Sequence, residues 1–550
     1  MRFRIFVSAC LLAVTCSAFA QQGKSNTPDA IYFNGKIVTV DSAFSIRQAF
    51  AVKGEEFIAV GTDAQVKALA DKSTRMVDLK GAAVIPGMAD NHDHLWNAGK
   101  YLRQGVDMIG VIYLSDMQDR LRKAVAAAKP GEVVFTTTGW RLQPGPTRKD
   151  LDEISKDVPI VVVGSRRGTG ALNSAALKLA GITNENPMFM GAPLRKDPSG
   201  ELTGTPPGYP QAVQLIDKLL PPWTLAAEEE MIAKGMEERN ALGITSIREL
   251  AVWPQAVRAF TRMRQQGKLT LRLALGIEFP DQANTAQSLA LLGYGVPFGD
   301  HWLRMDSVGE EPWTPGTMQT KPWTDLALAM NRMGWRPAPH VNADPARGTS
   351  PDDATNNTLD AYEAADRDSS IKEKRWYLEH VPYATSAQMD RMAKLGLIIS
   401  IQDAGFNPSF PVQLPKDRLE RINPVREFLD HKLVVIGGSD YMGPTATNQE
   451  PNNPFVTFHF YVARRSSEGI PAGPDESISR QDALRIFTVN PAYATFEEKV
   501  KGAIQPGMLA DFVVLNQDLM TVPEERIVLT HPLATFVGGK KVYSAKGSEF

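Results

Sequence analysis

Short apolar runs of strand length, separated by helical patterns, recur along most of this chain. Helical patterns at 225–242 and 387–395 are two of the separators. Such alternation is typical of parallel βα units, and eight units are the number that closes a TIM barrel. Eight candidate strands are present, at 84–91, 244–247, 271–275, 302–308, 335–339, 375–378, 397–401 and 433–436. The sequence therefore predicts an α/β fold built on a TIM (β/α)8 barrel.

Both ends of the chain carry shorter segments in which apolar and polar residues alternate. They lie at 30–33, 36–40, 56–60, 511–515 and 534–543. Turn residues such as Asn34-Gly35 separate them, as short strands require. We expect a small β-domain made from both termini, residues 28–85 and 496–550, beside a barrel that spans residues 86–495.

Two apolar runs are left over, at 133–138 and 160–163. Both lie in the long interval between the first and second barrel strands. We therefore assign residues from about 100 to about 235 to an insertion, which we expect to cover the mouth of the barrel.

The first twenty residues have the pattern of a signal peptide. Arg2 and Arg4 precede a short apolar stretch, and Ala18-Phe19-Ala20 supplies the small-x-small cleavage pattern. We expect cleavage after Ala20 and a periplasmic or secreted protein, with no membrane segment in the mature form. A membrane anchor and a lipoprotein modified at Cys16 are the alternatives.

Cysteine content and charge exclude several classes of protein. The only cysteines are Cys10 and Cys16, both in the expected leader, so a disulfide scaffold and a cysteine-ligated metal site are excluded. The net charge is −2, from 60 Lys and Arg against 62 Asp and Glu. The basic field that nucleic-acid binding needs is missing, and we expect a small-molecule substrate instead.

Histidines stand at the C-terminal ends of several predicted strands. His92 and His94 end the first strand and, being two residues apart, share one face of it. His340 ends the fifth strand, His380 the sixth, and Asp440 follows the eighth. TIM-barrel active sites are built at this end of the strands. We predict that these four imidazoles and one carboxylate bind metal, with zinc the best single candidate.

The remaining histidines and one glutamine have other predicted roles. His301 and His431 stand just before strands and are expected at the opposite rim, and His531 belongs to the terminal β-domain. His459 lies in an aromatic helical stretch, where it is either core or lines the pocket. Gln402 ends the seventh strand and is either a hydrogen-bond partner of the substrate or an ordinary polar strand end.

The order of these strand-end residues resembles the amidohydrolase superfamily. More narrowly, it resembles the amidohydrolase family 3 branch, which includes N-substituted formamide deformylase-like enzymes. Flanking segments at 30–61, 334–344, 484–507 and 510–515 are similar to that branch as well. The resemblance implies a metal-dependent hydrolase in which a composite β-sandwich from both termini lies beside the barrel.

The chain departs from the superfamily where a carboxylated lysine on strand four often bridges two metals. Gly309 falls near that lysine's place, and the next residue is Glu310. Glu310 is therefore a tentative metal ligand, bridging or terminal, and a solvated acidic turn is the alternative. The number of metal ions, one or two, stays open.

Other departures fall in the insertion and after the second strand. Arg166-Arg167-Gly168 stands where the branch often has a histidine, and the segment 203–208 lacks the branch's glutamate. Arg248-Glu249 replaces a His-Asp pair. The arginines indicate either an anionic group on the substrate or, more simply, a salt bridge between Arg248 and Glu249.

We predict an exported metal-dependent amidohydrolase that cleaves a non-peptide C–N bond by attack of metal-bound hydroxide. Asp440 takes the proton and passes it to the departing nitrogen. Trp96 and Trp313 lie on loops expected to face the pocket, which favours an apolar or aromatic substrate part, with loop packing as the alternative. An esterase or lactonase with the same site and a degenerate, non-catalytic binding or regulatory homologue are the alternatives. A homodimer is the oligomeric state that the fold suggests.

Overall fold

The structure is a computed structural model of the whole chain. It describes residues 27–137, 140, 142, 144–163, 170–189, 192–206, 216, 218–220, 223–279, 284–310, 320–341, 351–402, 422–441, 452–465, 469 and 471–550. The predicted signal peptide lies outside these residues. Within them, no helix combines the length and the apolar character that a membrane crossing requires.

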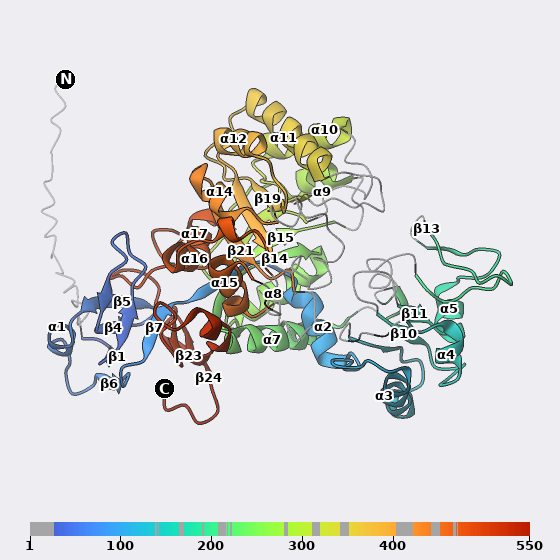
Figure 1. Ribbon diagram of the computed structural model, residues 1–550, viewed down its shortest axis with the longest axis horizontal. Coiled ribbons are helices and arrows are strands. Elements are labelled where there is room, and N and C mark those ends of the chain that lie inside the picture. Colours follow the sequence, from blue (N-terminus) through green and yellow to red (C-terminus); the bar gives the residue numbers. More distant parts are fainter. Residues whose placement is uncertain are drawn as a thin grey trace, which may run out of the picture.

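Two sheets lie at one end of the molecule, and the larger one combines strands from both termini (Figure 1). The four-stranded sheet contains β1 (Ala30–Phe33), β4 (Ala49–Lys53), β5 (Glu56–Gly61) and β6 (Arg75–Asp78). The six-stranded sheet contains β2 (Lys36–Val38), β3 (Ile46–Arg47), β7 (Ala83–Pro86), β22 (Phe512–Leu515), β23 (Pro532–Val537) and β24 (Lys540–Ser544).

Aromatic rings from both sheets pack together. Tyr32 of β1 stacks on Phe50 with ring centroids 4.9 Å apart, and Phe512 of β22 stacks on Phe536 at 4.3 Å. Tyr32 also meets Phe512 edge to face at 5.0 Å. Aromatic pairs of this kind add stability beyond the area they bury, so the two ends of the chain share one apolar core.

The central strands form two parallel sheets in which neighbours follow sequence order, a TIM-barrel-like arrangement. The first contains β8 (Met88–Asp93), β14 (Ile244–Val252), β15 (Arg272–Ile277) and β17 (Leu303–Val308), with the short antiparallel β16 (Phe298–Gly299) at its edge. The second contains β18 (His340–Val341), β19 (Tyr377–His380), β20 (Ile398–Gln402) and β21 (Val434–Gly438).

The described residues do not form the single closed barrel that the sequence predicts. No ladder joins the two sheets among these residues; isolated bridges, Asp93 with Tyr441 and Val308 with Pro337, and a few backbone hydrogen bonds connect them. The predicted strand 335–339 forms only an isolated bridge at Pro337, and β18 begins directly after it, because Pro337 and Pro339 have no N–H to donate to a ladder.

The predicted first strand, 84–91, is also two strands. β7 joins the six-stranded sheet and β8 joins the barrel strands, with Gly87 between them. A Cβ on Gly87 would lie 2.1 Å from Thr245 Oγ1, so only glycine fits at this change of direction.

Helices flank the parallel sheets, between successive strands and after β21 (Figure 1). They are α7 (Leu225–Ala241), α8 (Pro254–Gln265), α9 (Thr285–Leu292), α10 (Thr320–Met333), α11 (Pro351–Asp368), α12 (Ser386–Leu395), α14 (Val425–Asp430), α15 (Pro454–Ala463), α16 (Arg480–Ile486) and α17 (Val489–Ala494). The sequence sets their ends locally. In α12, for example, Thr385 and Gln388 form a capping box, and Gly396 ends the helix with a φ of 66°.

The insertion is a separate lobe on the right of Figure 1, joined to the barrel strands through α2 (Leu95–Gln104) and α7. Its elements include α3 (Leu114–Ala127), β9 (Val134–Phe135), α4 (Arg148–Asp152), β10 (Ile160–Val162), β11 (Ala171–Leu172), α5 (Ser174–Ala180), β12 (Met188–Phe189) and β13 (Ala192–Pro193). The left-over apolar runs of the sequence supply β9 and β10, which pair in parallel in a three-stranded sheet of their own.

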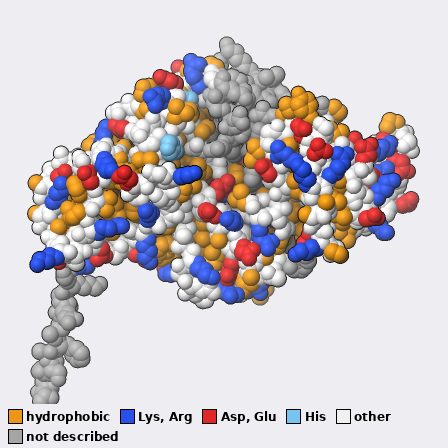
Figure 2. Space-filling model, turned by 90° about the horizontal axis from the view of Figure 1, so that it is seen from below, with side chains coloured by type: hydrophobic (Ala, Val, Ile, Leu, Met, Phe, Trp, Pro, Cys, Tyr) orange, Lys and Arg blue, Asp and Glu red, His pale blue; other side chains and the backbone are white. Residues whose placement is uncertain are grey.

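Basic and acidic side chains are interspersed over the face of the molecule in Figure 2. No continuous basic surface is visible on that face, in line with the near-neutral charge of the sequence.

Candidate metal centre

Six side chains meet at the C-terminal ends of the barrel strands. In one group of four and one group of three, ligand atoms lie within 4.8 Å of one another, and Glu310 belongs to both groups. We call these six side chains the rim cluster: His92, His94, Glu310, His340, His380 and Asp440. They come from β8, from the residues just after β8, β17 and β21, and from β18 and β19.

Glu310 lies between the two groups of histidines. Its Oε2 is 3.3 Å from His92 Nε2 and 3.4 Å from His94 Nε2. Its Oε1 is 2.8 Å from His380 Nε2 and also contacts His340 Nδ1. The side chain is about nine-tenths buried, so the solvated acidic turn is wrong. One carboxylate oxygen facing each group is the arrangement expected of a bridging ligand.

Asp440 completes the first group. Its Oδ1 lies 3.3 Å from His94 Nε2 and 3.7 Å from His92 Nε2. Its backbone N–H donates to the carbonyl of His92 at 2.7 Å, which holds the end of β21 against β8. Asp440 and His380 both adopt left-handed backbone conformations, with φ of 52° and 72°. Such non-glycine conformations are strained and concentrate at functional sites.

Two ring nitrogens of the first group fit a cation. His92 Nδ1 contacts Glu379 Oε2 at 2.8 Å, and His94 Nδ1 lies 3.3 Å from the carbonyl of Leu250. Both partners are acceptors, so each Nδ1 donates its hydrogen and each Nε2 is turned toward Glu310 and Asp440. Both Nε2 atoms are buried and have no hydrogen-bond partner. Since buried polar atoms are normally paired, this donor set fits a divalent metal ion.

The electrostatics of the first group also favour positive charge. Burial alone would lower the pKa of His92, but the carboxylates of Glu310 and Glu379 outweigh it and raise that pKa to about 10. Burial likewise opposes charge on Glu310, yet His92 and His340 hold the pKa of its carboxyl well below the usual range. In the second group, burial and the neighbouring His340 lower the pKa of His380 to about 4.

A buried network that the sequence analysis missed orients His92. Glu379 Oε1 accepts a hydrogen bond from Arg248 at 2.8 Å, while Arg248 Nε lies 3.3 Å from Asp306 Oδ2. Arg336 pairs with the other oxygen of Asp306. The sequence did contain a signal for this network, namely charged residues within otherwise apolar strands. Such groups are buried only when they are paired, so each of them implies a buried partner.

The predicted salt bridge between Arg248 and Glu249 is wrong. Arg248 pairs with Glu379 and Asp306 and is buried, so it is not placed to meet a substrate anion. Glu249 instead accepts hydrogen bonds from the backbone N–H groups of Leu95 and Trp96, at 2.6 and 2.9 Å. These two residues open α2, so Glu249 stabilises the helix that starts directly after His94. Adjacent strand residues point to opposite faces, which explains the separate partners.

Asp93, between the two histidines, is held in the same way from the other face of β8. Arg239 of α7 donates to both of its carboxylate oxygens, at 2.5 and 2.8 Å, and both side chains are buried. This bidentate pair fixes the strand end from which His92 and His94 project.

The other residues that the sequence singled out lie in different places. Gln402 is the last residue of β20 and is 4% exposed. Trp96 lies in the first turn of α2 and packs in the main core rather than on a loop. His459 is buried on α15, and this burial lowers the pKa of its imidazole. Trp313 and the segment 166–168 lie outside the described residues.

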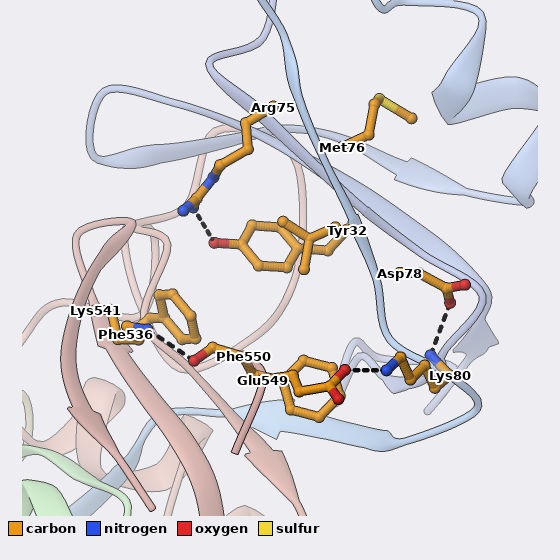
Figure 3. A pocket seen from close by; sticks show the side chains of 10 residues that line it. Tyr32, Arg75, Met76, Asp78, Lys80, Phe536, Lys541, Glu549 and Phe550 are labelled. Carbon is orange, nitrogen blue, oxygen red and sulfur yellow. Dashed lines mark hydrogen bonds and ion pairs between the residues drawn. The ribbon is translucent and has the colours of Figure 1, made fainter. Parts of the chain in front are cut away.

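A cavity of about 370 Å³ lies on the β-domain and not at the barrel strands (Figure 3). Its polar groups are paired among themselves, Arg75 with the Tyr32 hydroxyl at 2.9 Å and Lys80 with Glu549. No rim-cluster residue lines it.

Comparisons with known proteins agree with this geometry. A model described as "Amidohydrolase family" matches residues 75–543. The chain is 27% identical to N-substituted formamide deformylase from Arthrobacter pascens, over 94% of this chain and 99% of that protein. It is 25% identical to Protein LONG AFTER FAR-RED 3 from Arabidopsis thaliana, over 98% and 97%. An uncharacterized metal-dependent hydrolase from Pyrococcus horikoshii OT3 has a similar structure, with a TM-score of 0.70 and 20% identity over 90% of this chain and 99% of that one.

Proposed function

The chain belongs to the amidohydrolase family, and from this we propose that it is a metal-dependent hydrolase that cleaves carbon–nitrogen bonds other than peptide bonds. The rim cluster is the proposed active site. The observation that carries the proposal is that the buried Nε2 atoms of His92 and His94 make no hydrogen bond and are turned toward Glu310 and Asp440.

We propose that the rim cluster holds two divalent ions, with zinc the best candidate. His92, His94 and Asp440 would hold one ion, His340 and His380 the other, and Glu310 would bridge them. Imidazole nitrogen and carboxylate oxygen are ligands that zinc accepts, and the mature chain would have no cysteine to compete. When bound, zinc supplies a water of lowered pKa and polarises the carbonyl oxygen of the substrate.

The protein's own groups then move the proton. Asp440 is the proposed general base, because its carboxylate lies at the edge of the first group and 10% of it is exposed. It would hold the proton released by the attacking water and deliver it to the departing nitrogen. Glu379 keeps the imidazole of His92 in one tautomer, since its carboxylate can only accept the Nδ1 hydrogen.

We propose an N-substituted amide as substrate, with N-substituted formamides as the first compounds to test. The support is the activity for which the Arthrobacter relative is named, since that protein aligns over nearly its whole length. Esters and lactones are the alternative, because their better leaving groups need less help from Asp440.

Two finer structural proposals accompany the function. The eight central strands would close as a barrel, since both sheet edges already meet at bridges. The two terminal sheets would form a composite β-sandwich around the aromatic core. Residues 1–20 would direct export and be removed after Ala20, which N-terminal sequencing of the secreted or periplasmic protein tests by finding Gln21 first.

The decisive experiment for the function is a substrate panel on the purified chain, stripped of metal and reloaded with zinc. The panel contains N-substituted formamides, N-acyl amino acids, aryl amides, esters and lactones. We expect zinc-dependent turnover of C–N substrates, and loss of turnover with retained zinc in D440N. A zinc-loaded chain that hydrolyses only esters would favour the alternative. One that hydrolyses nothing on the panel would support a non-catalytic homologue.

A further inference from the structure

The seventh barrel strand ends in a buried amide with an unused acceptor. Gln402, the last residue of β20, is 4% exposed. Its Nε2 donates to Ser400 Oγ at 2.8 Å, whereas its Oε1 is buried without a hydrogen-bond partner. A buried amide oxygen left unpaired is costly, so its presence at a strand end next to the rim cluster calls for a donor.

The orientation of this amide follows from its hydrogen bond to Ser400. Nε2 of Gln402 donates to Ser400 Oγ at 2.8 Å, which turns Oε1 away from Ser400. Oε1 is therefore the atom of the amide that stays unpaired.

The strand register places the Gln402 side chain on the rim-cluster side of the sheet. Residues two apart on a strand share a face, so Gln402 lies on the same face as Ser400. Ser400 pairs in register with Glu379, whose carboxylate contacts His92. Independently, Gln402 pairs in register with Gly438. A Cβ built on Gly438 would lie 2.7 Å from His92 Cβ, so the same side of β21 faces His92.

We propose that Gln402 Oε1 accepts a hydrogen bond from the N–H of a secondary amide substrate, and so selects amides over esters at this site. This inference rests on the proposed function. A carbonyl oxygen can only accept, so its partner must be a donor on the ligand. The nitrogen of a secondary amide carries such a donor at the bond to be cleaved, whereas an ester or a tertiary amide carries none.

Three probes that differ only at this position test the inference: N-(2-phenylethyl)formamide, its N-methyl derivative and 2-phenylethyl formate. The zinc-loaded wild-type chain is compared with Q402M, which keeps the length of the side chain and removes the acceptor. We expect kcat/KM for the secondary formamide to fall about 3- to 10-fold, the effect of one neutral hydrogen bond. Values for the N-methyl formamide and the ester should stay within about twofold.

Gln388 supplies the matched control. It is also 4% exposed, but its Nε2 donates to Asn356 at 3.1 Å and its Oε1 accepts from the Thr385 backbone at 2.8 Å. Q388M should therefore lower stability without changing the ratio of kcat/KM between the secondary and N-methyl formamides. If Q402M does not fold, Q402N, which keeps the amide but withdraws it by one methylene, should show the same selective loss.

The outcomes separate this inference from the proposed function. If the wild-type chain turns over the secondary formamide and Q402M lowers all three probes equally, or none, the role of Gln402 is refuted and the hydrolase stands. If the zinc-loaded wild-type chain turns over none of the probes and no other amide, the proposed function fails and this inference fails with it.

Discussion

Replacing Gly438 with alanine should displace His92 and lower turnover by about a hundredfold. Gly438 is the last residue of β21, which packs against β8. An added Cβ would lie 2.5 Å from His92 N and 2.7 Å from His92 Cβ. Ordinary van der Waals contact begins at 3.4 Å, so the shortfalls are 3.4 − 2.5 = 0.9 Å and 3.4 − 2.7 = 0.7 Å.

These contacts cannot be relieved by rotating a side chain, because the nearest atom is backbone. Either His92 or the end of β21 must move by most of an ångström, and β21 also positions Asp440. A displacement of about 1 Å in a catalytic constellation can cost about a hundredfold in rate. The predicted loss therefore follows from the distance alone.

The assay is kcat/KM on the best substrate of the panel, together with zinc affinity from competition with a chelator. G437A is the matched control, since the nearest atoms to its Cβ belong to the side chains of Phe487 and Ile486, at 3.0 and 3.1 Å. Those side chains can yield, so G437A should keep zinc and most of its activity. Wild-type kcat/KM in G438A, or an equal loss in G437A, would refute the reasoning.

Three further predictions test other parts of the structure. E310Q removes one of the two oxygens proposed to bridge the ions and should reduce bound zinc from the proposed two ions per chain to one, measured by plasma mass spectrometry; an unchanged zinc content would count against the bridge. R239M leaves the buried carboxylate of Asp93 unpaired and should cost about 3–5 kcal/mol in urea unfolding, so a loss below about 1 kcal/mol contradicts it. Glu497 is buried beside Lys501 at 2.7 Å; burial opposes its charge, but Lys501 and Arg304 lower its pKa below the unfolded value. Its stabilisation is therefore present above the unfolded pKa of about 4.3 and is lost as pH falls through the folded pKa. The stability difference between wild type and E497Q should shrink from neutral pH to strongly acidic pH, and a constant difference would overturn this.

The strand-end histidines could be located from the sequence because strand periodicity is local. His92 and His94, two residues apart, were expected on one face, and their Nε2 atoms do approach the same two carboxylates. The C-terminal ends of parallel strands meet at one rim regardless of the conformation of the loops. His340, His380 and Asp440 could therefore be assigned to the same place.

The ion-pair partners of the buried charged residues could not be predicted from the sequence. Arg248 has Glu249 beside it in the sequence, but its partner in the fold is Glu379, 131 positions away. Adjacent residues on a strand face opposite directions, so sequence proximity pointed to the wrong carboxylate. Nor could the two-sided contact of Glu310 be predicted, since it depends on the backbone path after β17.

The predicted strand boundaries are wrong where the chain passes from one sheet to another. The apolar run 84–91 has one uniform pattern, yet Gly87 divides it between the β-domain and the barrel strands, because Thr245 leaves no room for a side chain there. The predicted fifth strand, 335–339, forms only an isolated bridge, and β18 begins after it, because Pro337 and Pro339 have no N–H to donate to a ladder.

Anomalous diffraction at the zinc edge, from crystals of the zinc-loaded protein, tests the central claim most directly. The claim predicts one peak at about 2.0–2.2 Å from the Nε2 atoms of His92 and His94, with a second beside His340 and His380 and Glu310 between them. A zinc-loaded crystal with no peak at the rim cluster, or with peaks only at surface residues, would contradict it.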